Sequence, residues 1–214
     1  MLNKSKSLIL FLLATGIALI FAAFQAGDKK QITNKFASQI IDGDKSSCHQ
    51  TDQGSVIDWH SNLKLKYTDF RASSKGSPGF AVATTSSAFA YSITDRGGEI
   101  SGSIYVRFYC EKSWWNPDFI LDEVLEHEQL HFDICELFGR KLYKEVLELR
   151  EEGKLNKRTI QRLQSKFEKQ YSDYQDLYDK ETDHSTKGDE QRKWNKKVKR
   201  ELADLSDYSD YHSF

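Results

Sequence analysis

The spacing of hydrophobic and polar residues changes once along the chain, near residue 113. Between residues 55 and 112 apolar and polar positions alternate over short segments rich in β-branched and aromatic side chains, separated by turn signals such as "SSKGSPG" and "TDRGGE". Beyond Asn116 the apolar positions recur every three or four residues, which is the helical period. The pattern predicts three to five strands followed by long helices. This order gives an α+β fold with an N-terminal antiparallel or mixed sheet.

The helical half divides into three segments. The first helix is expected to follow Asn116, a good N-cap, with Pro117 in the first helical position, and to end just before Gly153. A second helix is expected from about residue 156, and a third over residues 189–205. The apolar stripe of the second helix consists of Ile160, Leu163, Phe167, Tyr171, Tyr174 and Tyr178.

The N-terminal residues have the pattern of an export segment. Residues 8–24 form an uncharged, apolar run that follows Lys4 and Lys6. This pattern indicates either a signal peptide covering residues 1–26 or an uncleaved N-terminal membrane anchor. In both cases the domain is expected outside the cytoplasmic membrane, whether periplasmic, extracellular or anchored and facing outward.

The rest of the chain has the length and composition of one domain. It is part of a 214-residue sequence that is 38% hydrophobic, enough for a single core and too little for two. We expect a lead-in or linker over residues 27–54, the folded domain over 55–205 and a loose polar tail over 206–214. The net charge of −1 gives no indication of a nucleic-acid partner.

Three cysteines bear on the expected compartment. An exported chain can oxidise one pair, which leaves one cysteine over. Cys135 lies within the first helix and is expected to pack as a small apolar residue. We therefore favour a disulfide between Cys48 and Cys110, although the sequence alone leaves the pairing open.

Residues 125–136, "LEHEQLHFDICE", hold two histidines four residues apart with a glutamate directly after the first. Residues four apart in a helix are offset by about 40°, so His127 and His131 project from one face and can bind one ion. Neutral imidazoles suit Zn²⁺, whose catalytic sites use three protein ligands and one open position. Glu128, offset by about 100° from His127, can reach water there and act as the general base. The spacing is that of the His-Glu-x-x-His zinc peptidases.

The alternative is a solvated helix face that matches the motif by chance, which happens in about one in a hundred chains of this length. However, Val124, Ile134 and Phe138 fall on the same helix face as the two histidines. The histidines are therefore expected to point into the interior, where unpaired polar groups are costly. A metal ion is the simplest partner for them, and we favour a zinc site.

A third zinc ligand must come from elsewhere in the chain. The remaining histidines are His49, His60, His184 and His212. Asp133 and Glu136 lie on other faces of the motif helix and point away. The second helix needs a partner for its apolar stripe, and packing on the motif helix would bring His184 near the site. We favour His184 as the third ligand, with Glu181 as the runner-up.

Several neighbouring residues are candidates for supporting roles. Asp179 or Asp183 could hydrogen-bond a ligating imidazole. Glu123 could do the same, although an exposed acid favoured by the helix dipole explains it equally well. Tyr178 could stabilise an oxyanion, but its position in the apolar stripe favours packing.

Other strings along the chain add a family resemblance. They are "IDWHSNLKLKYTDF", "AVATTSS", "KSWW", "HEQLHFDICELFGRKL", "YDKETDHS" and "QRKW". Together they span residues 56–194 and resemble a bacterial family catalogued as a domain of unknown function and regarded as exported zinc proteases. The resemblance implies a zincin-like fold, with His127 and His131 as ligands, Glu128 as base and His184 as third ligand. Ser185 stands where the family usually has glycine.

The sequence therefore predicts an exported zinc metallopeptidase that hydrolyses peptide bonds in a peptide or protein substrate. The competing hypothesis is an exported binding or scaffold module whose metal site is structural or vestigial. A structural site closes with a fourth protein ligand and has no use for a carboxylate beside a water. Glu128 thus favours the enzyme. Residues 8–24 are also a candidate membrane tether, and the oligomeric state stays open.

Overall fold

The computed structural model describes residues 45–77 and 81–214. The predicted export segment and residues 27–44 of the predicted lead-in lie outside these residues. Within the described part of the chain, no helix combines the length and apolar character that a membrane crossing requires.

The described chain has a mixed α+β fold in which one sheet holds four antiparallel strands in the order β1-β2-β5-β4. These strands are β1 (His49–Thr51), β2 (Gly54–Asp58), β4 (Ser87–Arg96) and β5 (Glu99–Tyr109). The hairpin of β4 and β5 turns at Gly97 and Gly98, which both have positive φ angles, 65° and 94°. A two-residue turn of this kind needs residues without a Cβ penalty. A smaller antiparallel sheet pairs β3 (Ala83–Thr84) with β6 (Trp114–Trp115).

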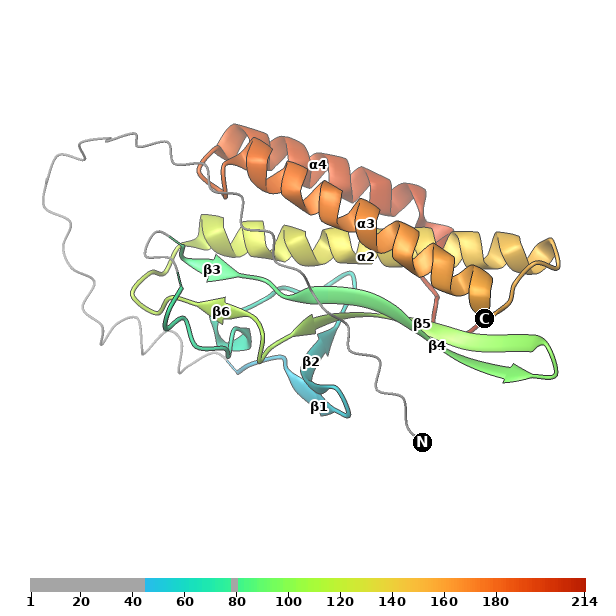
Figure 1. Cartoon of the computed structure of the whole chain (residues 1–214). Coiled ribbons are helices and arrows are strands. Elements are labelled where there is room, and N and C mark those ends of the chain that lie inside the picture. Colours follow the sequence, from blue (N-terminus) through green and yellow to red (C-terminus); the bar gives the residue numbers. More distant parts are fainter. Residues whose placement is uncertain (1–44, 78–80) are drawn as a thin grey trace, which may run out of the picture. The chain divides into compact units, whose positions relative to one another are not determined.

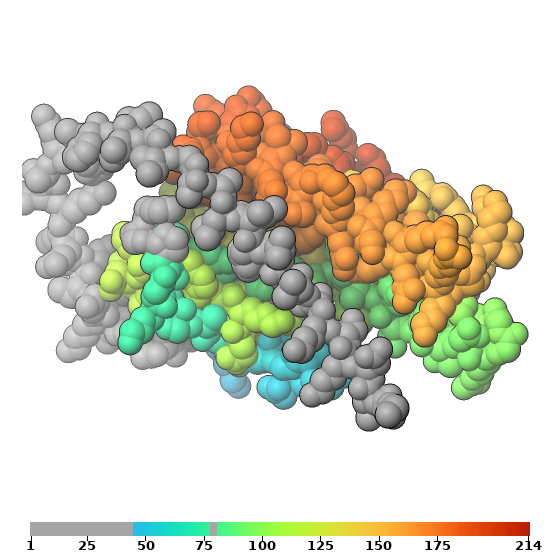
Figure 2. Space-filling view, in the orientation of Figure 1, coloured from blue at the N-terminus to red at the C-terminus, as the bar shows by residue number. Residues whose placement is uncertain are grey.

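Three long helices follow the strands, as the sequence predicts. They are α2 (Asp122–Glu151), α3 (Lys157–Thr182) and α4 (Gly188–Asp204), accompanied by the short 3₁₀ helices η1 (Tyr67–Asp69) and η2 (Ser206–Tyr208). Figure 1 shows α2 between the sheet and the other two helices, and α2 contacts β4, β5, α3 and α4. In the space-filling view of Figure 2, α3 hides most of α2 on the face shown. Because α2 lies between the sheet and the two other helices, half of its residues are buried.

Gly139 lets α2 approach the sheet closely. A Cβ atom at this position would lie 2.5 Å from Cγ2 of Val106 in β5, which is far inside van der Waals contact. Val106 and Phe138 are themselves buried. A glycine within a predicted helix indicates either a kink or a close packing contact, and at Gly139 the structure shows the close contact.

The helix ends follow local signals in some places and not in others. Asn156 caps α3 as expected, since its side chain accepts hydrogen bonds from the backbone N–H groups of Arg158 and Thr159. Gly153, with φ 66°, directly follows the C-cap of α2. The start of α2 was expected after Asn116 and is wrong by five residues. The backbone there forms a turn, in which Phe119 N–H donates to the Asn116 carbonyl.

The sequence "VIDWHSNLKLKYTDF" alternates on both sides of "HSN" and predicts a strand after that turn, and this prediction is also wrong. Leu63 and Leu65 are buried and Lys64 is exposed, so the alternation is real. The backbone nevertheless finds a different partner: the Leu65 N–H donates to Oε1 of Gln129 in α2 at 2.7 Å. A side chain of the helix thus takes the place of a neighbouring strand.

The C-terminal residues are not the loose tail that their composition predicts. Tyr211 and Phe214 are buried. Ile104 donates its N–H to the carbonyl of Tyr211, and Gly102 exchanges two backbone hydrogen bonds with Phe214. The Tyr211 hydroxyl also donates to Oε2 of the buried Glu136 at 2.6 Å. Residues 211–214 therefore line the edge of β5 opposite β4.

The favoured disulfide is confirmed, and it shortens the predicted lead-in. Cys48 is bonded to Cys110, and Cys135 is a free, buried thiol. Asp69 is fully buried and accepts hydrogen bonds from Ser46 Oγ and the Ser47 N–H. Residues 45–54 thus belong to the folded domain, because their hydrogen bonds and β1 attach them to it.

Replacing Gly139 with alanine is expected to destabilise the protein. The new methyl group would overlap Val106, and both residues belong to elements that cannot separate without losing core contacts. We expect the free energy of unfolding to fall by about 1–3 kcal/mol, even though alanine favours helix by about 1 kcal/mol. Chemical denaturation measures the change.

Gly188→Ala is the matched control. The nearest atom to a Cβ at Gly188 is the end of the flexible Arg192 side chain, at 3.4 Å. This variant should be as stable as the wild type or slightly more stable. Equal stability of the two alanine variants would show that the close approach at Gly139 is not a constraint.

Candidate metal centre

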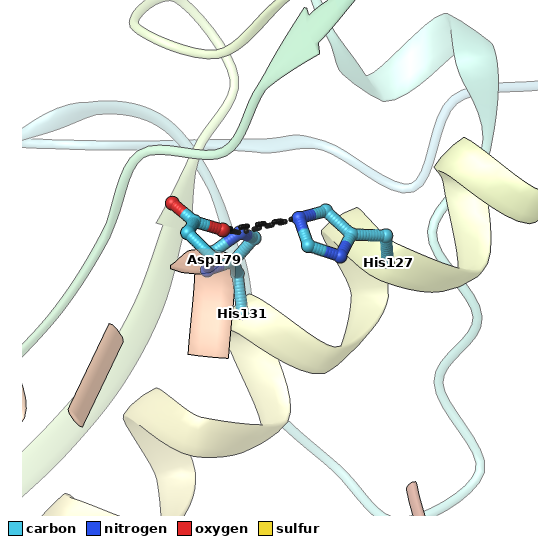
Figure 3. A group of neighbouring side chains, drawn as sticks. All are labelled: His127, His131 and Asp179. Atoms are coloured by element: carbon cyan, nitrogen blue, oxygen red, sulfur yellow. Dashed lines mark hydrogen bonds and ion pairs between the residues drawn. The ribbon is translucent and has the colours of Figure 1, made fainter. Parts of the chain in front are cut away.

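Two helices bring three ligand-type side chains together. His127 and His131 project from one face of α2 toward the carboxylate of Asp179 in α3, as Figure 3 shows. Oδ1 of Asp179 lies 3.1 Å from Nε2 of His127 and 2.9 Å from Nε2 of His131, and the two Nε2 atoms are 3.1 Å apart. These three atoms form a nearly equilateral triangle. Of the described residues, only these three form such a cluster of metal-binding side chains.

Gln175 fixes the orientation of His131. The amide Nε2 of Gln175 donates to the His131 backbone oxygen at 3.0 Å, so the amide oxygen faces the ring. Nδ1 of His131 lies 2.6 Å from that oxygen and must carry the hydrogen. The lone pair of the neutral ring is thereby placed on Nε2, which points into the triangle.

Gln191 in α4 does the same for His127. Its Oε1 lies 3.0 Å from Nδ1 of His127 and accepts from the Tyr178 hydroxyl at 2.9 Å, while its Nε2 donates to Asn195. The ring of Tyr178 also stacks on His127, with centroids 4.5 Å apart. Both imidazoles are therefore held by an amide on one nitrogen and offer the other, an arrangement that typically accompanies metal ligation.

The electrostatics of the cluster favour a positive charge at its centre. Burial opposes the charged form of His131, but its hydrogen bond to Asp179 and the nearby Glu128 outweigh burial and raise its pKa to about 9. Burial acts to raise the pKa of Asp179, yet hydrogen bonds from His127 and His131 hold that pKa well below its usual value. A divalent cation at the centre would satisfy these groups.

Three described side chains, those of Glu128, Thr68 and Gln164, have a buried polar atom without a hydrogen-bond partner, and of these only Glu128 is next to the cluster. Its side chain is 5% exposed, and its Oε2 is buried and accepts no hydrogen bond from any described residue. A buried acceptor without a partner costs about 1–3 kcal/mol, and more when charged. The Glu128 backbone oxygen accepts from Oγ1 of Thr85 at 3.2 Å, which ties this turn of α2 to the segment after β3.

A cavity of about 500 Å³ opens onto the cluster. Its lining includes the four residues His127, Glu128, His131 and Asp179, and also β3 and Leu121, the residue before α2. His184, Ser185 and Thr186 complete the lining. The remaining histidines do not line this cavity.

The predicted third ligand His184 lies beside the cluster and outside it. Its Nδ1 is 3.8 Å from Oδ2 of Asp179, and its side chain is 76% exposed. The chain leaves α3 through three consecutive non-glycine residues with positive φ angles, Asp183, His184 and Ser185. This conformation is disfavoured for residues with a Cβ, and such strain collects at functional sites. Asp179 occupies the position beside the two Nε2 atoms that His184 was expected to take.

The other predicted residues are placed as follows. Glu181 turns toward α4, where its carboxylate accepts from the indole Nε1 of Trp194 at 2.8 Å. Asp183 caps α3 and accepts from the Thr186 hydroxyl. Glu123 is exposed in the first turn of α2.

The hydroxyl of Tyr178 is engaged inside the fold. It lies within hydrogen-bonding distance of Gln191 Oε1 and of the His127 backbone oxygen, and the residue is fully buried. Burial raises the pKa of Tyr178, so its hydroxyl stays a donor. Tyr178 does not line the cavity, and its contacts support the packing role.

Gln175 and Gln191 were missed at the sequence level, and Asp179 was considered only as a hydrogen-bond partner. A signal was present. Gln175 is a polar residue between Tyr174 and Tyr178 in the apolar stripe of α3, four residues before Asp179, and Gln191 precedes the buried Trp194 by three. A polar side chain on a buried face requires a polar partner.

Comparisons with known proteins identify a domain within the chain. A family described as "Bacterial protein of unknown function (DUF922)" matches residues 110–185. This stretch contains the two histidines, Glu128, Asp179 and His184. No curated protein and no solved structure matches the chain. The expected resemblance to a bacterial domain of unknown function is thus confirmed for this stretch, and the match gives no activity.

Gln175→Leu is expected to weaken zinc binding. The substitution removes the acceptor that holds the Nδ1–H of His131, so the ring loses its fixed tautomer and orientation. We expect the zinc affinity to fall about 10- to 100-fold, as measured by competition with a chelating dye. Gln161→Leu, at an exposed position of the same helix, should leave the affinity unchanged. An unchanged affinity in Gln175→Leu would contradict the role given to this amide.

Proposed function

We propose that this protein is an exported zinc-dependent metallopeptidase in which Glu128 is the general base. The observation that carries the proposal is the unpartnered, buried Oε2 of Glu128 beside the triangle formed by His127, His131 and Asp179. Within the described fold this oxygen has no hydrogen-bond partner, so packing alone does not account for a buried carboxylate at this place. A water molecule held between Glu128 and a cation would give that oxygen a partner.

The donor set fits zinc. Two imidazole nitrogens and one carboxylate oxygen are common ligands of catalytic zinc, with bonds of about 2.0–2.2 Å. A tetrahedron with such bonds has edges of about 3.3–3.6 Å, slightly longer than the 2.9–3.1 Å sides of the triangle. Two histidines and a carboxylate also suit ferrous iron. The adjacent Glu128 favours zinc, because hydrolysis needs a base at this place and oxygen chemistry does not.

The residues around the cluster have separable roles in this mechanism. When bound, zinc supplies a Lewis acid that lowers the pKa of water to about 7 and polarises a carbonyl. His127, His131 and Asp179 would hold it, with Gln191 and Gln175 fixing the two rings. Glu128 orients the attacking water through its free oxygen, accepts a proton from it and delivers the proton to the leaving amine.

The free edge of β3 supports a peptide as the substrate. Asn116 donates its N–H to the Val82 carbonyl, which directs this carbonyl toward β6. Ala83, next in the strand, therefore presents its backbone groups to the opposite edge, which no described strand occupies. This edge borders the cavity, and an extended peptide can add to it by backbone hydrogen bonds. A motif helix beside such an edge strand also supports the zincin-like fold type.

The proposal includes export. It is supported by the apolar run at residues 8–24 behind Lys4 and Lys6 and by the disulfide between Cys48 and Cys110, since disulfides persist in oxidising compartments. A membrane tether through residues 8–24 is compatible with this location.

One observation favours the competing function of a binding or scaffold module. His184 lies close enough to Asp179 that a modest movement of the turn at 183–185 would bring it to the cluster. As a fourth protein ligand it would close the site and make the metal structural. As a replacement for Asp179 it would keep the site open.

Glu128→Gln tests the chemistry. The variant should keep its fold and zinc content and lose most of its turnover, about 100-fold or more, because only the proton acceptor is removed. Zinc content is measured by elemental analysis, which also separates zinc from iron, and turnover by hydrolysis of a peptide library. Wild-type rates in this variant would exclude Glu128 as the base. A zinc-loaded wild type that cleaves no peptide would favour the binding module.

Single alanine variants at positions 179, 184 and 181 identify the third ligand. From the distances we expect Asp179→Ala to lose most of its zinc affinity and His184→Ala to change it little. Glu181→Ala is the control, because that carboxylate faces Trp194. Loss of affinity in the His184 variant alone would restore the sequence-based assignment. Losses in both the Asp179 and the His184 variants, without any hydrolysis in the wild type, would indicate a closed structural site.

A further inference from the structure

The lining of the cavity at the candidate metal centre also has an apolar part. Besides the titratable side chains of the cluster and His184, this lining carries only uncharged side chains. Its apolar members are Ala81, Val82, Ala83, Leu121 and Val124. The cavity thus presents an aliphatic wall directly beside the position of the proposed chemistry.

Leu121 is the exposed part of this wall. Among the described residues, three large hydrophobic side chains are exposed: Phe119, Leu121 and Leu177. Phe119 and Leu121 both precede α2, and of the three only Leu121, which is 38% exposed, lines the cavity. An exposed apolar side chain in the wall of a cavity marks a binding surface more often than one elsewhere on the surface does.

The position of Leu121 in α2 is a second, independent observation. It is the N-cap of this helix, and its side chain makes no capping hydrogen bond. Ser, Thr, Asn and Asp are strongly preferred at N-caps because they satisfy a free backbone N–H, and leucine cannot. A leucine here therefore costs helix stability and is not buried in return. Recognition of a ligand explains both facts.

We propose that Leu121 and Val124 form a specificity subsite for an aliphatic side chain of the peptide substrate, next to the bond that is cleaved. This inference rests on the proposed peptidase function. A peptide added to the free edge of β3 would place alternate side chains toward the cavity wall. The nearest of these side chains would pack between Ala83 of the strand and Leu121 and Val124 of the helix.

The expected selectivity follows from the burial of one aliphatic side chain. A site of this kind separates leucine from alanine by about 10- to 100-fold in kcat/KM. It rejects aspartate and lysine more strongly, since no described side chain of the aliphatic wall can pair with a charge. The substrate class is therefore an extended peptide with a leucine-like residue beside the scissile bond.

The test compares Leu121→Asp with Leu177→Asp. Aspartate is a good N-cap, so the first variant keeps the start of α2 intact. Leu177 has nearly the same exposure, 41%, and lies outside the cavity, which makes it the matched control. Each assay uses the zinc-loaded protein and a set of peptide substrates. Within a set the peptides are identical except at one position, which holds leucine, alanine, aspartate or lysine. Further sets vary each of the other positions of the peptide in turn.

We expect the wild type and Leu177→Asp to prefer leucine at one position by about 10-fold or more over alanine. In Leu121→Asp this preference should disappear and lysine should gain, with unchanged zinc content. Equal preferences in the two variants, or no preference in the wild type, would overturn the subsite.

Peptide binding to the Glu128→Gln variant keeps the subsite testable without turnover. Fluorescence anisotropy of the same labelled peptides should show tighter binding of the leucine peptide, and Leu121→Asp in this background should abolish the difference. Leucine-selective binding with no hydrolysis by the wild type would disprove the peptidase function and keep the subsite. Binding without selectivity, or no binding at all, would disprove the subsite.

Discussion

The enclosure of α2 is the constraint on which the rest of the structure depends. Half of the residues of this helix are buried between a sheet and two further helices, so each polar side chain among them needs a partner within the protein. Glu136 finds Arg140 and Tyr211, and Gln129 finds the backbone of Leu65. The two histidines find amide oxygens from α3 and α4. Among the buried polar side chains of α2, only Glu128 keeps an oxygen without a hydrogen-bond partner, and the proposed chemistry depends on this oxygen.

Much of the fold was predictable because its signals are local. The glycine pair between β4 and β5, the Asn156 cap and Gly153 each act through the conformation of a few neighbouring residues, and the structure uses all of them. The errors arise where a distant partner decides. The alternating residues around Leu65 do not form a strand because a glutamine of α2 binds their backbone. The C-terminal residues look polar, yet β5 offers them a free edge.

The candidate site divides in the same way. The positions of His127, Glu128 and His131 relative to each other depend only on helix geometry, so their spacing predicts them. The third member of the cluster depends on how α3 is aligned against α2 and on how the chain leaves α3. The left-handed turn at residues 183–185 contains no glycine that would announce it. With this turn His184 lies beside the cluster, 3.8 Å from Asp179, and Asp179 is the third member of the triangle.

The pairing of residues 211–214 with β5 has a consequence for solubility. Beyond the short β2, the hydrogen-bonding groups of β5 would otherwise face solvent as an open template on which another chain could add a strand. The C-terminal segment occupies this edge with its own backbone hydrogen bonds, and the buried side chains of Tyr211 and Phe214 hold the segment in place. Residues 211–214 therefore contribute buried side chains to the core and also prevent another chain from pairing with this edge of β5.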